Sequence, residues 1–345
     1  MNTVFRAILA LVALVALGWA GSACAWGSQG HQLVGATADR LLTPNAAAHV
    51  KTELGMPLKI AATWPDCVRA VNHLKGKFTY VADPRFRIWC GVFETTAREA
   101  AMVDYAGRNW NACVDDDKGR PCNAKYHYAD VSLQRDHYQA GQVGTGDHDV
   151  VHAIEAAILR LQDKPVPAPF SIRTKAEALF MLTHFVGDIH QPLHMGAAYL
   201  DAAGAQIDPD ATPGDHKANR TQGGNAIMHG SQDLHGEWDE ILPSLGLDPT
   251  PDVLAQARAT PATPGEVNAW PEAWATDSLL ASRQAYAGLT FSARKPFLVR
   301  GRSQLAWPAV SADQKGYNAA KRALQAQQIA KAGKRLADVL NTLWP

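Results

Sequence analysis

The chain has 345 residues, 47% of them hydrophobic, with 33 Lys and Arg balanced by 33 Asp and Glu. This balance excludes a polycationic nucleic-acid coat, so any attraction for phosphate has to come from a local site. The length fits one large domain as well as two, and no linker divides the sequence after residue 25. We therefore expect residues 26–345 to form a single domain.

Residues 1–25 have the pattern of a secretory signal peptide. Arg6 precedes an apolar run over residues 7–20, and Ala23-Cys24-Ala25 fits an A-x-A cleavage site. The run is short for a transmembrane helix, which needs about 20 apolar residues. Lipidation of Cys24 is the alternative, but Gly21 stands where such signals usually have Leu. The pattern predicts cleavage after Ala25, no membrane anchor, and a secreted or periplasmic protein that starts at Trp26.

Apolar residues at helical spacing dominate the rest of the chain, and runs of alternating β-branched residues are few, which predicts an all-α fold with many helices. Thr43-Pro44 starts one expected helix, and others are expected over Asp147–Gln162, Ile172–Ile189 and Tyr317–Leu343. Gly and Pro cluster in residues 201–224 and 249–264, which we expect to be surface loops or insertions.

Four cysteines follow the expected cleavage site, namely Cys67, Cys90, Cys113 and Cys122. An even number in an exported chain suggests disulfides, and three pairings are possible. A polar turn over residues 115–119 favours the short loop from Cys113 to Cys122, which leaves Cys67 to pair with Cys90. No C-x-x-C pair supports a zinc site made of thiolates.

Two pairs of histidine and aspartate share the spacing i, i+4, which places both members on one face of a helix. His184 and Asp188 lie in the helix expected to end before Pro192, and His235 and Asp239 lie in H-G-E-W-D. One such pair alone is more often a buried histidine hydrogen-bonded to an aspartate. Its repetition, with His194 just beyond Pro192, favours zinc, which imidazole and carboxylate bind well.

Three upstream segments extend this pattern: Trp26-Gly-Ser-Gln-Gly-His31, Thr63-Trp-Pro-Asp66 and Tyr126-His127-Tyr-Ala-Asp130. With them, the chain resembles the S1/P1 family of trinuclear-zinc single-strand nucleases, which is related to bacterial zinc phospholipase C. The resemblance runs from Trp26 into the last expected helix. It implies a secreted nuclease that hydrolyses single-stranded DNA and RNA to 5′-phosphorylated products and also removes 3′-phosphates from nucleotides, with single-stranded nucleic acid and nucleotides as substrates.

The resemblance also implies three Zn²⁺ ions in a cleft. One is held by Asp66, His127 and His184, and a second by His31 with the free amine and the carbonyl of Trp26, while Asp188 bridges the two. The third is held by His194, His235 and Asp239. Nitrogen and oxygen donors suit catalytic zinc, and a water shared by the paired ions would be the nucleophile near neutral pH.

Further residues are assigned by the same resemblance. Arg69 would act with Asp66 and Asp188 in catalysis by stabilising charge on the phosphate, although a surface salt bridge is the alternative. Tyr128 would stack on a base, unless it is a core aromatic residue, and Asp130 would hydrogen-bond the base edge. Asn225, in Gly223-Gly224-Asn225, would border the substrate, unless the segment is only a turn.

The sequence indicates no chemical role for the other histidines. His190 lies two residues from Asp188, so we expect it to pack or to support the ligands from another helix face. The remaining histidines are expected to be structural or exposed, namely His49, His73, His137, His148, His152, His216 and His229.

Two other functions fit the sequence less well. Zinc phospholipase C has a glutamate as the last ligand of its isolated zinc, where this chain has Asp239, and Tyr128 with Asp130 suits a base better than a lipid. A zinc-storage protein would have no need of Arg69. The sequence intervals Asp66–His127 and His194–His235 are longer than is usual for the family, so substrate preference stays open. A monomer is expected.

Overall fold

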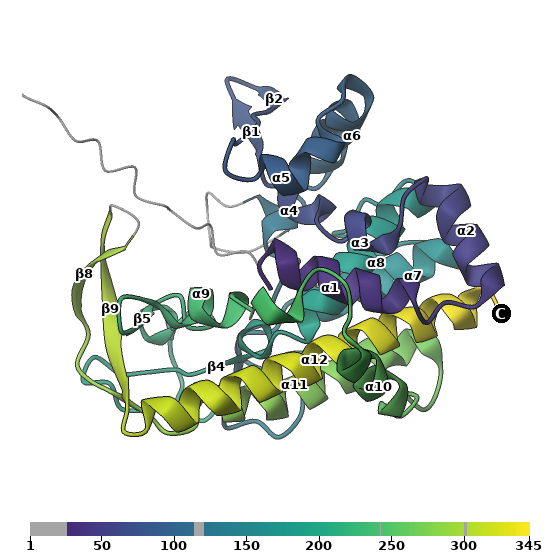
Figure 1. The fold of residues 1–345 in the computed structure, drawn as a ribbon. Coiled ribbons are helices and arrows are strands. Elements are labelled where there is room, and N and C mark those ends of the chain that lie inside the picture. The colour runs from purple at the N-terminus through teal and green to yellow at the C-terminus, as the bar shows by residue number, and fades with distance from the viewer. Residues whose placement is uncertain (1–25, 114–120, 242, 300–301) are drawn as a thin grey trace, which may run out of the picture.

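The computed structural model describes residues 26–113, 121–241, 243–299 and 302–345 (Figure 1). The predicted signal peptide therefore lies outside the described residues. Helices predominate, and a smaller β layer lies at one end of the molecule, where the longest helix begins (Figure 1). None of the described helices is long and apolar enough to span a membrane.

The longer helices are α1 (Ser28–Asp39), α2 (Pro44–Leu54), α6 (Thr96–Arg108), α7 (Val150–Leu161), α8 (Lys175–Ile189), α10 (Pro251–Ala259), α11 (Trp270–Tyr286) and α12 (Gln314–Leu343). The short ones are α3 (Leu58–Ala61), α4 (Trp64–Val68), α5 (Arg87–Cys90) and α9 (Leu234–Asp239). The 3-10 turns are η1 (Gly91–Phe93), η2 (Cys122–Ala124), η3 (Pro192–His194), η4 (Lys217–Asn219), η5 (Pro243–Leu245) and η6 (Val267–Ala269).

Helix α8 is the centre of the main hydrophobic core. Thr174 caps its start by accepting a hydrogen bond from the Glu177 backbone N–H, the arrangement that Ser or Thr followed by Glu favours. Its residues from Ala178 to Ile189 are almost all buried, and it contacts α1, α3, α4, α7 and α12. A helix that is apolar on nearly every face has to be enclosed by other helices or strands. The polar side chains that α8 does carry are consequently held in the interior.

Helix α12 runs the length of the molecule and packs against α1, α8 and α10 (Figure 1). Its contact with α1 is close at Gly333, where an added Cβ would lie 2.5 Å from Cβ of Thr37. Only glycine allows the two helix backbones to approach in this way. This contact fixes α1, whose first turn follows the predicted mature N-terminus.

The prediction of an all-α fold is only partly correct, because the chain also forms sheets. Strands β5 (Ile227–His229), β6 (Gln232–Asp233), β7 (Leu289–Phe291), β8 (Lys295–Val299) and β9 (Arg302–Ser311) form one sheet in the order β6-β5-β9-β7, with β8 also paired to β9. Strand β9 has few β-branched residues, and its burial comes from Ala306, Trp307 and Ala309. Packing therefore decides strand formation here, and a search for β-branched alternation missed it.

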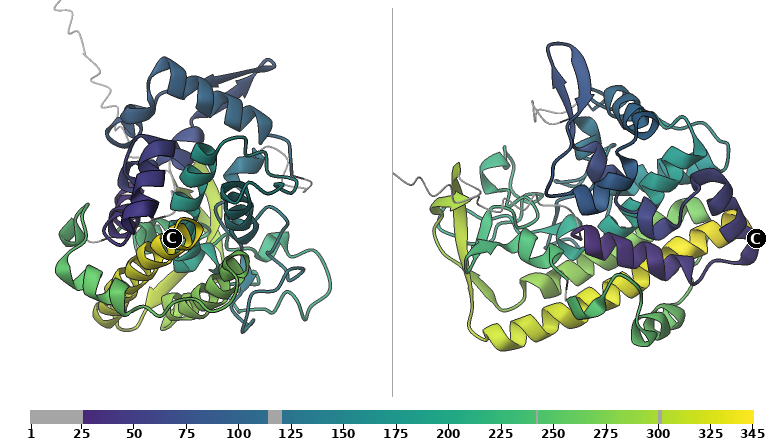
Figure 2. Two further views of the ribbon diagram at one scale, coloured as in Figure 1. Left: turned by 90° about the vertical axis from the view of Figure 1, so that its right-hand side faces the viewer. Right: turned by 45° about the horizontal axis from the view of Figure 1, so that its top comes forward.

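Two pairs of short strands complete the fold. Strands β3 (Val131–Ser132) and β4 (Gly196–Ala197) are parallel, and β1 (Val71–Leu74) and β2 (Lys77–Tyr80) form an antiparallel hairpin. This hairpin and α6 belong to the long interval between Asp66 and His127. Both views of Figure 2 show them standing apart from the layer made by α1 and α12.

Most expected helices are present, with shifted ends. Thr43 caps α2 as predicted, and the Leu343 end of α12 is also correct, but α7, α8 and α12 each begin three residues from the expected position. The expected loop over 249–264 is wrong in part, because it contains α10, capped by Thr250 with Pro251 in its first turn. Both predicted disulfides, Cys67–Cys90 and Cys113–Cys122, are present.

Candidate metal centre

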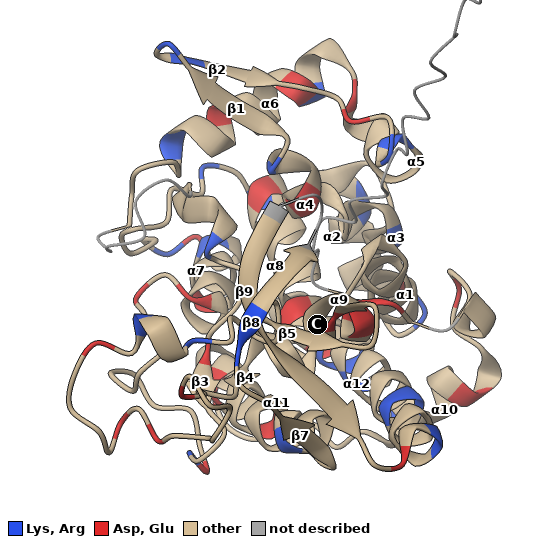
Figure 3. Cartoon of the chain, turned by 90° about the vertical axis from the view of Figure 1, so that its left-hand side faces the viewer, with Lys and Arg blue, Asp and Glu red and all other residues tan. Residues whose placement is uncertain are grey.

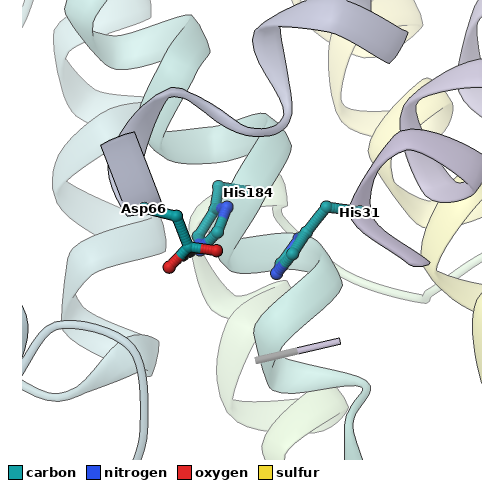
Figure 4. A group of neighbouring side chains, drawn as sticks. All are labelled: His31, Asp66 and His184. Atoms are coloured by element: carbon teal, nitrogen blue, oxygen red, sulfur yellow. Dashed lines mark ion pairs between the residues drawn. The ribbon is translucent and has the colours of Figure 1, made fainter. Parts of the chain in front are cut away.

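Three helices bring one group of candidate metal-binding side chains together. His31 comes from α1, Asp66 from the short helix α4, and His184 from the middle of α8. Figure 4 shows the three side chains pointing toward one another from these separate elements. The rings of His31 and His184 stack with centroids 3.7 Å apart, and Nε2 of His184 lies 4.0 Å from Oδ1 of Asp66.

Asp188 lies one turn after His184 and joins this group to His127. Its Oδ2 lies 2.9 Å from Nδ1 of His127 and 3.2 Å from Nε2 of His184, and its Oδ1 lies 3.3 Å from Nε2 of His31. All four side chains are buried. One carboxylate thus faces three imidazoles, which is an arrangement able to bridge two cations.

His194, His235 and Asp239 form a further group of buried donors. His194 lies in η3, and α9 supplies the other two side chains from one face. The Nε2 atoms of the two histidines are 3.1 Å apart, and Oδ2 of Asp239 lies 3.6 Å from Nε2 of His235. The first turn of α9 is capped by Asp233, whose side chain accepts from the Gly236 N–H.

Backbone carbonyls determine which ring nitrogens face inward. Nδ1 of His184 lies 2.6 Å from the Ala62 carbonyl, Nδ1 of His194 lies 2.7 Å from that of His127, and Nδ1 of His235 lies 2.7 Å from that of Gly223. A carbonyl only accepts, so each Nδ1 carries a proton, and in the neutral form of each ring Nε2 has no proton. Each Nε2 then presents a lone pair to its neighbours.

These lone pairs fit metal ions. The Nε2 atoms of His194 and His235 face each other with no proton between them, and two donors about 2.0–2.1 Å from a tetrahedral zinc lie roughly 3.3 Å apart. Several buried donor atoms also have no hydrogen-bond partner among the described residues: both ring nitrogens of His31, Oδ2 of Asp66, Oδ1 of Asp188 and Oδ2 of Asp239. Buried polar atoms without partners are costly, and cations would satisfy them.

The electrostatics agree with this arrangement. Burial alone would raise the pKa of Asp188, but the imidazoles of His184 and His127 outweigh it and hold that pKa well below its usual value. Burial lowers the pKa of His194 to about 3, so its ring is neutral, as a ligand must be. Burial, reinforced by Asp233 and Asp188, raises the pKa of Asp239 well above its usual value despite a hydrogen bond from Gln191. A cation at this position would counter that effect.

Trp26 is completely buried beside this centre. Its side chain packs on Gly30, where an added Cβ would lie 2.8 Å from Cβ of Trp26. The next residue, Gly27, donates its backbone N–H to the carbonyl of Asp239 at 2.9 Å. The expected first residue of the mature chain is therefore adjacent to residues of both donor groups.

The predicted substrate residues lie around the donors. Arg69 is the residue directly after α4. Its Nη1 lies 3.4 Å from Oδ1 of Asp66, and its side chain is 34% exposed. Tyr128 and Asp130 follow His127 and are half-buried, and Tyr199 donates its hydroxyl to the Asp130 carbonyl. Asn225 donates from Nδ2 to the Gln222 carbonyl, two residues from the Gly223 carbonyl that orients His235.

Sequence reasoning missed several supporting groups. Gln191 donates from Nε2 to Oδ1 of Asp239 at 2.7 Å, and its place between His190 and His194 was the available signal. His190 itself is buried and donates from Nδ1 to the Val186 carbonyl, while Arg335 donates to its Nε2. It supports the end of α8, as expected. The carbonyls of Ala62, His127 and Gly223 carry no side-chain signal.

The comparison with protein families agrees with the site. The model of the S1/P1 nuclease family matches residues 26–345, which is essentially the whole chain after the predicted signal peptide. A comparison with curated proteins gave no match. A match of this extent, together with the clustered His and Asp side chains, shows that the chain belongs to the S1/P1 nuclease family, a family of phosphodiester hydrolases.

Proposed function

We propose that this protein is a secreted, zinc-dependent nuclease that cleaves single-stranded DNA and RNA to 5′-phosphorylated products and also removes the 3′-phosphate of nucleotides. The observation that carries the proposal is the convergence of donor atoms in three groups of His and Asp side chains, all of them buried except the half-buried Asp66. Zinc suits these donors better than calcium or magnesium, which prefer oxygen ligands alone. Two disulfides support export, because disulfides persist in oxidising compartments.

The proposed ligands divide as the sequence resemblance implies. Asp66, His127 and His184 would hold one ion, and His31 with the amino terminus of Trp26 would hold a second. Asp188 would contribute to both of these ions. The third would be held by His194, His235 and Asp239. Bound zinc supplies Lewis-acid activation of water and phosphate near neutral pH. The chain then needs no side-chain nucleophile.

The remaining residues bind and orient the substrate. The guanidinium of Arg69 is near Asp66 and partly exposed, so it can donate two parallel hydrogen bonds to phosphate oxygens whose charge grows in the transition state. Tyr128 offers a ring on which any base can stack, and the Asp130 carboxylate can accept from a base edge. Stacking selects unpaired bases, because a paired base is already stacked within its duplex. Asn225, in the segment whose Gly223 carbonyl orients His235, would border the substrate.

The proposal is tested by comparing four substrates under one zinc-loaded condition: single-stranded DNA, RNA, a 3′-nucleotide and phosphatidylcholine. We expect hydrolysis of the first three, 5′-phosphorylated ends on the oligonucleotide products, and about three zinc ions per chain by metal analysis. Hydrolysis of phosphatidylcholine alone would replace the nuclease by a phospholipase C. Full activity with one metal ion or none would contradict the trinuclear site.

A further inference from the structure

The long interval between Asp66 and His127 carries a feature that the proposed chemistry does not use. Strands β1 and β2 form a hairpin that begins two residues after Arg69 and packs on α6. Its two-residue turn, Lys75-Gly76, has positive φ at both positions, 51° and 76°, as tight hairpin turns require. The hairpin is therefore a defined structure and not an irregular loop.

Three rings gather on this hairpin. His73 and Phe78 face each other across the strands and stack with centroids 4.2 Å apart and planes 14° apart. Trp110, just after α6, meets both rings edge-on, at 5.7 Å and 5.2 Å. Phe78 rests on α6, where a Cβ added at Gly107 would lie 3.3 Å from its ring. His73 is exposed, so the cluster ends in an aromatic surface that reaches solvent.

The hairpin is also basic. Lys75 and Lys77 lie at its turn, both are exposed, and neither forms an ion pair with any described residue. Residues 71–80 contain no acidic side chain. Figure 3 shows the basic residues at the turn between β1 and β2, at the outer end of the hairpin. Aromatic rings interleaved with cations are the pattern that binds single-stranded nucleic acid without reading its sequence.

We propose that the β1–β2 hairpin binds the nucleotides that flank the scissile phosphate, and so extends the substrate site beyond Arg69. A base stacks on His73, while Lys75 and Lys77 contact phosphates. This inference rests on the proposed nuclease function. Lys75 is six residues after Arg69, and six extended residues span about 20 Å at most. Because stacked nucleotides advance about 3.4 Å each, the turn lies within about six nucleotides of Arg69.

The alternative is that the three rings have a purely structural role and only pack the hairpin against α6. Phe78 and Trp110 have that role, since both are half-buried against it. His73 and the two lysines do not, because they are exposed. These three residues are therefore the ones to change, with Phe78 and Trp110 left intact.

The charge is tested with the double variant Lys75→Asn/Lys77→Gln. Asn tolerates the positive φ at position 75. The matched control is Lys51→Gln/Lys315→Gln, which removes two exposed lysines from α2 and α12. We expect the hairpin variant to raise KM severalfold on a twelve-residue oligothymidylate and to leave KM on a 3′-mononucleotide unchanged. The slope of log KM against log salt should fall by about 1.4, which is 0.7 for each lost phosphate contact.

The stacking is tested with His73→Ala and His73→Phe. We expect the alanine variant to raise KM on the oligonucleotide about fivefold or more, with kcat unchanged, and the phenylalanine variant to retain the original KM. Unfolding temperatures measured alongside distinguish lost binding from lost structure.

The outcomes separate this inference from the function on which it rests. If the unmodified protein cleaves neither substrate, the proposed nuclease function fails. If it cleaves both, but the lysine variant changes neither the KM ratio of long to short substrates nor the salt slope, the hairpin does not bind nucleic acid. An equal effect of the α2 and α12 control would assign the change to net charge and would likewise overturn the inference.

Discussion

The orientation of single imidazoles determines what this centre can bind. In His184, His194 and His235 the Nδ1–H is fixed on a backbone carbonyl, so Nε2 of the neutral ring is the nitrogen that offers a lone pair. Because the carbonyls belong to Ala62, His127 and Gly223, three separate segments hold the rings in place. Such outer contacts orient a ligand before the metal arrives and raise its basicity.

Arg69 provides a prediction at this scale. If its guanidinium acts on charge that develops in the transition state, Arg69→Ala should lower kcat by on the order of a hundredfold or more, with zinc content unchanged. Arg69→Lys should restore only part of the rate, because an ammonium cannot form the bidentate contact. Steady-state kinetics with metal analysis on the same samples measures both. A kcat near that of the unmodified protein would leave Arg69 as a salt-bridge partner of Asp66.

The amino group of Trp26 provides a second prediction at the residue scale. Its reference pKa is about 7.7, so a neighbouring dication can displace the proton, whereas an amide nitrogen is a very poor zinc donor. A variant with one residue before Trp26 should fold, lose one zinc and lose most of its activity. The same variant with a cleavable extension should recover both after proteolysis. Three zinc ions and full activity in a verified extended chain would remove Trp26 from the ligand set.

Side chains at this scale were predictable and backbone groups were not. The i, i+4 spacing of His184 with Asp188 and of His235 with Asp239 makes each pair recognisable in the sequence, and both pairs cluster as expected. A carbonyl donor exists at every residue, so nothing in the sequence distinguishes Gly223 from its neighbours. Gln191 was only partly predictable. Its polar side chain can be read from the sequence, but its hydrogen-bond partner Asp239 is distant in the chain.

At the scale of elements, α9 depends on contacts made by its opposite face. Glu237 accepts from Lys321 of α12 at 2.6 Å and lies 2.6 Å from Nδ1 of His229, and all three side chains are largely buried. They border a cavity of about 520 Å³ that none of the metal-binding side chains lines. The Glu237–Lys321 contact therefore holds α9, which carries His235 and Asp239, against α12.

Lys321→Met should therefore loosen α9. Removing one partner of a buried ion pair costs about 3–5 kcal/mol, because the remaining charge is uncompensated. We expect a lower unfolding temperature and loss of one zinc, from the group on α9. Lys331→Met is the control on the same helix, since Arg335 still pairs with Asp277 there. That variant should keep its full zinc content, and equal zinc loss in both would contradict the role of Lys321.

Helix α7 carries a pH-dependent contribution to stability. Burial raises the pKa of Glu155 to about 7, which His152 opposes and the carboxylates of Glu272 and Asp149 reinforce. A carboxyl with a raised pKa stabilises the fold below its unfolded value near 4.5, and this contribution is lost as pH rises through 7. Glu155→Gln should raise the unfolding temperature at pH 8 and change it little at pH 4. The exposed Glu266→Gln serves as control, and a uniform shift at both pH values would contradict the assignment.

Elements with local end signals were predictable, and those decided by packing were not. The Thr-Pro pair that identified α2 recurs at Thr250-Pro251, yet the surrounding Pro residues favoured a loop and concealed α10. Strand β9 shows the other difficulty. It is long, but its parallel pairing with β5 joins segments that are far apart in the sequence. Strand pairing of this kind has no local signature.

At the scale of the whole molecule, the centre joins elements that are distant in the chain. Its donors come from α1, α4, α8, α9, η3 and the segment before β3. Without cations, the carboxylates of Asp66, Asp188 and Asp239 each have one buried oxygen atom with no hydrogen-bond partner in the described part of the chain. Binding of the proposed metal ions would consequently be coupled to folding, because the unfolded chain does not hold these side chains together.

This coupling predicts how chelation changes stability. One site at a thousand times its Kd adds about 4.1 kcal/mol to the free energy of unfolding. Since 1 kcal/mol shifts the unfolding temperature of a 150–250-residue domain by about 2–4 °C, removal of all zinc should lower it by more than 10 °C even in this larger chain. Calorimetry with and without chelator measures the shift. Added zinc should reverse it and magnesium should not, because magnesium binds imidazole poorly. An unfolding temperature that is indifferent to chelation would mean that the buried donors satisfy one another, and the centre would then be a hydrogen-bonded core and not a metal site.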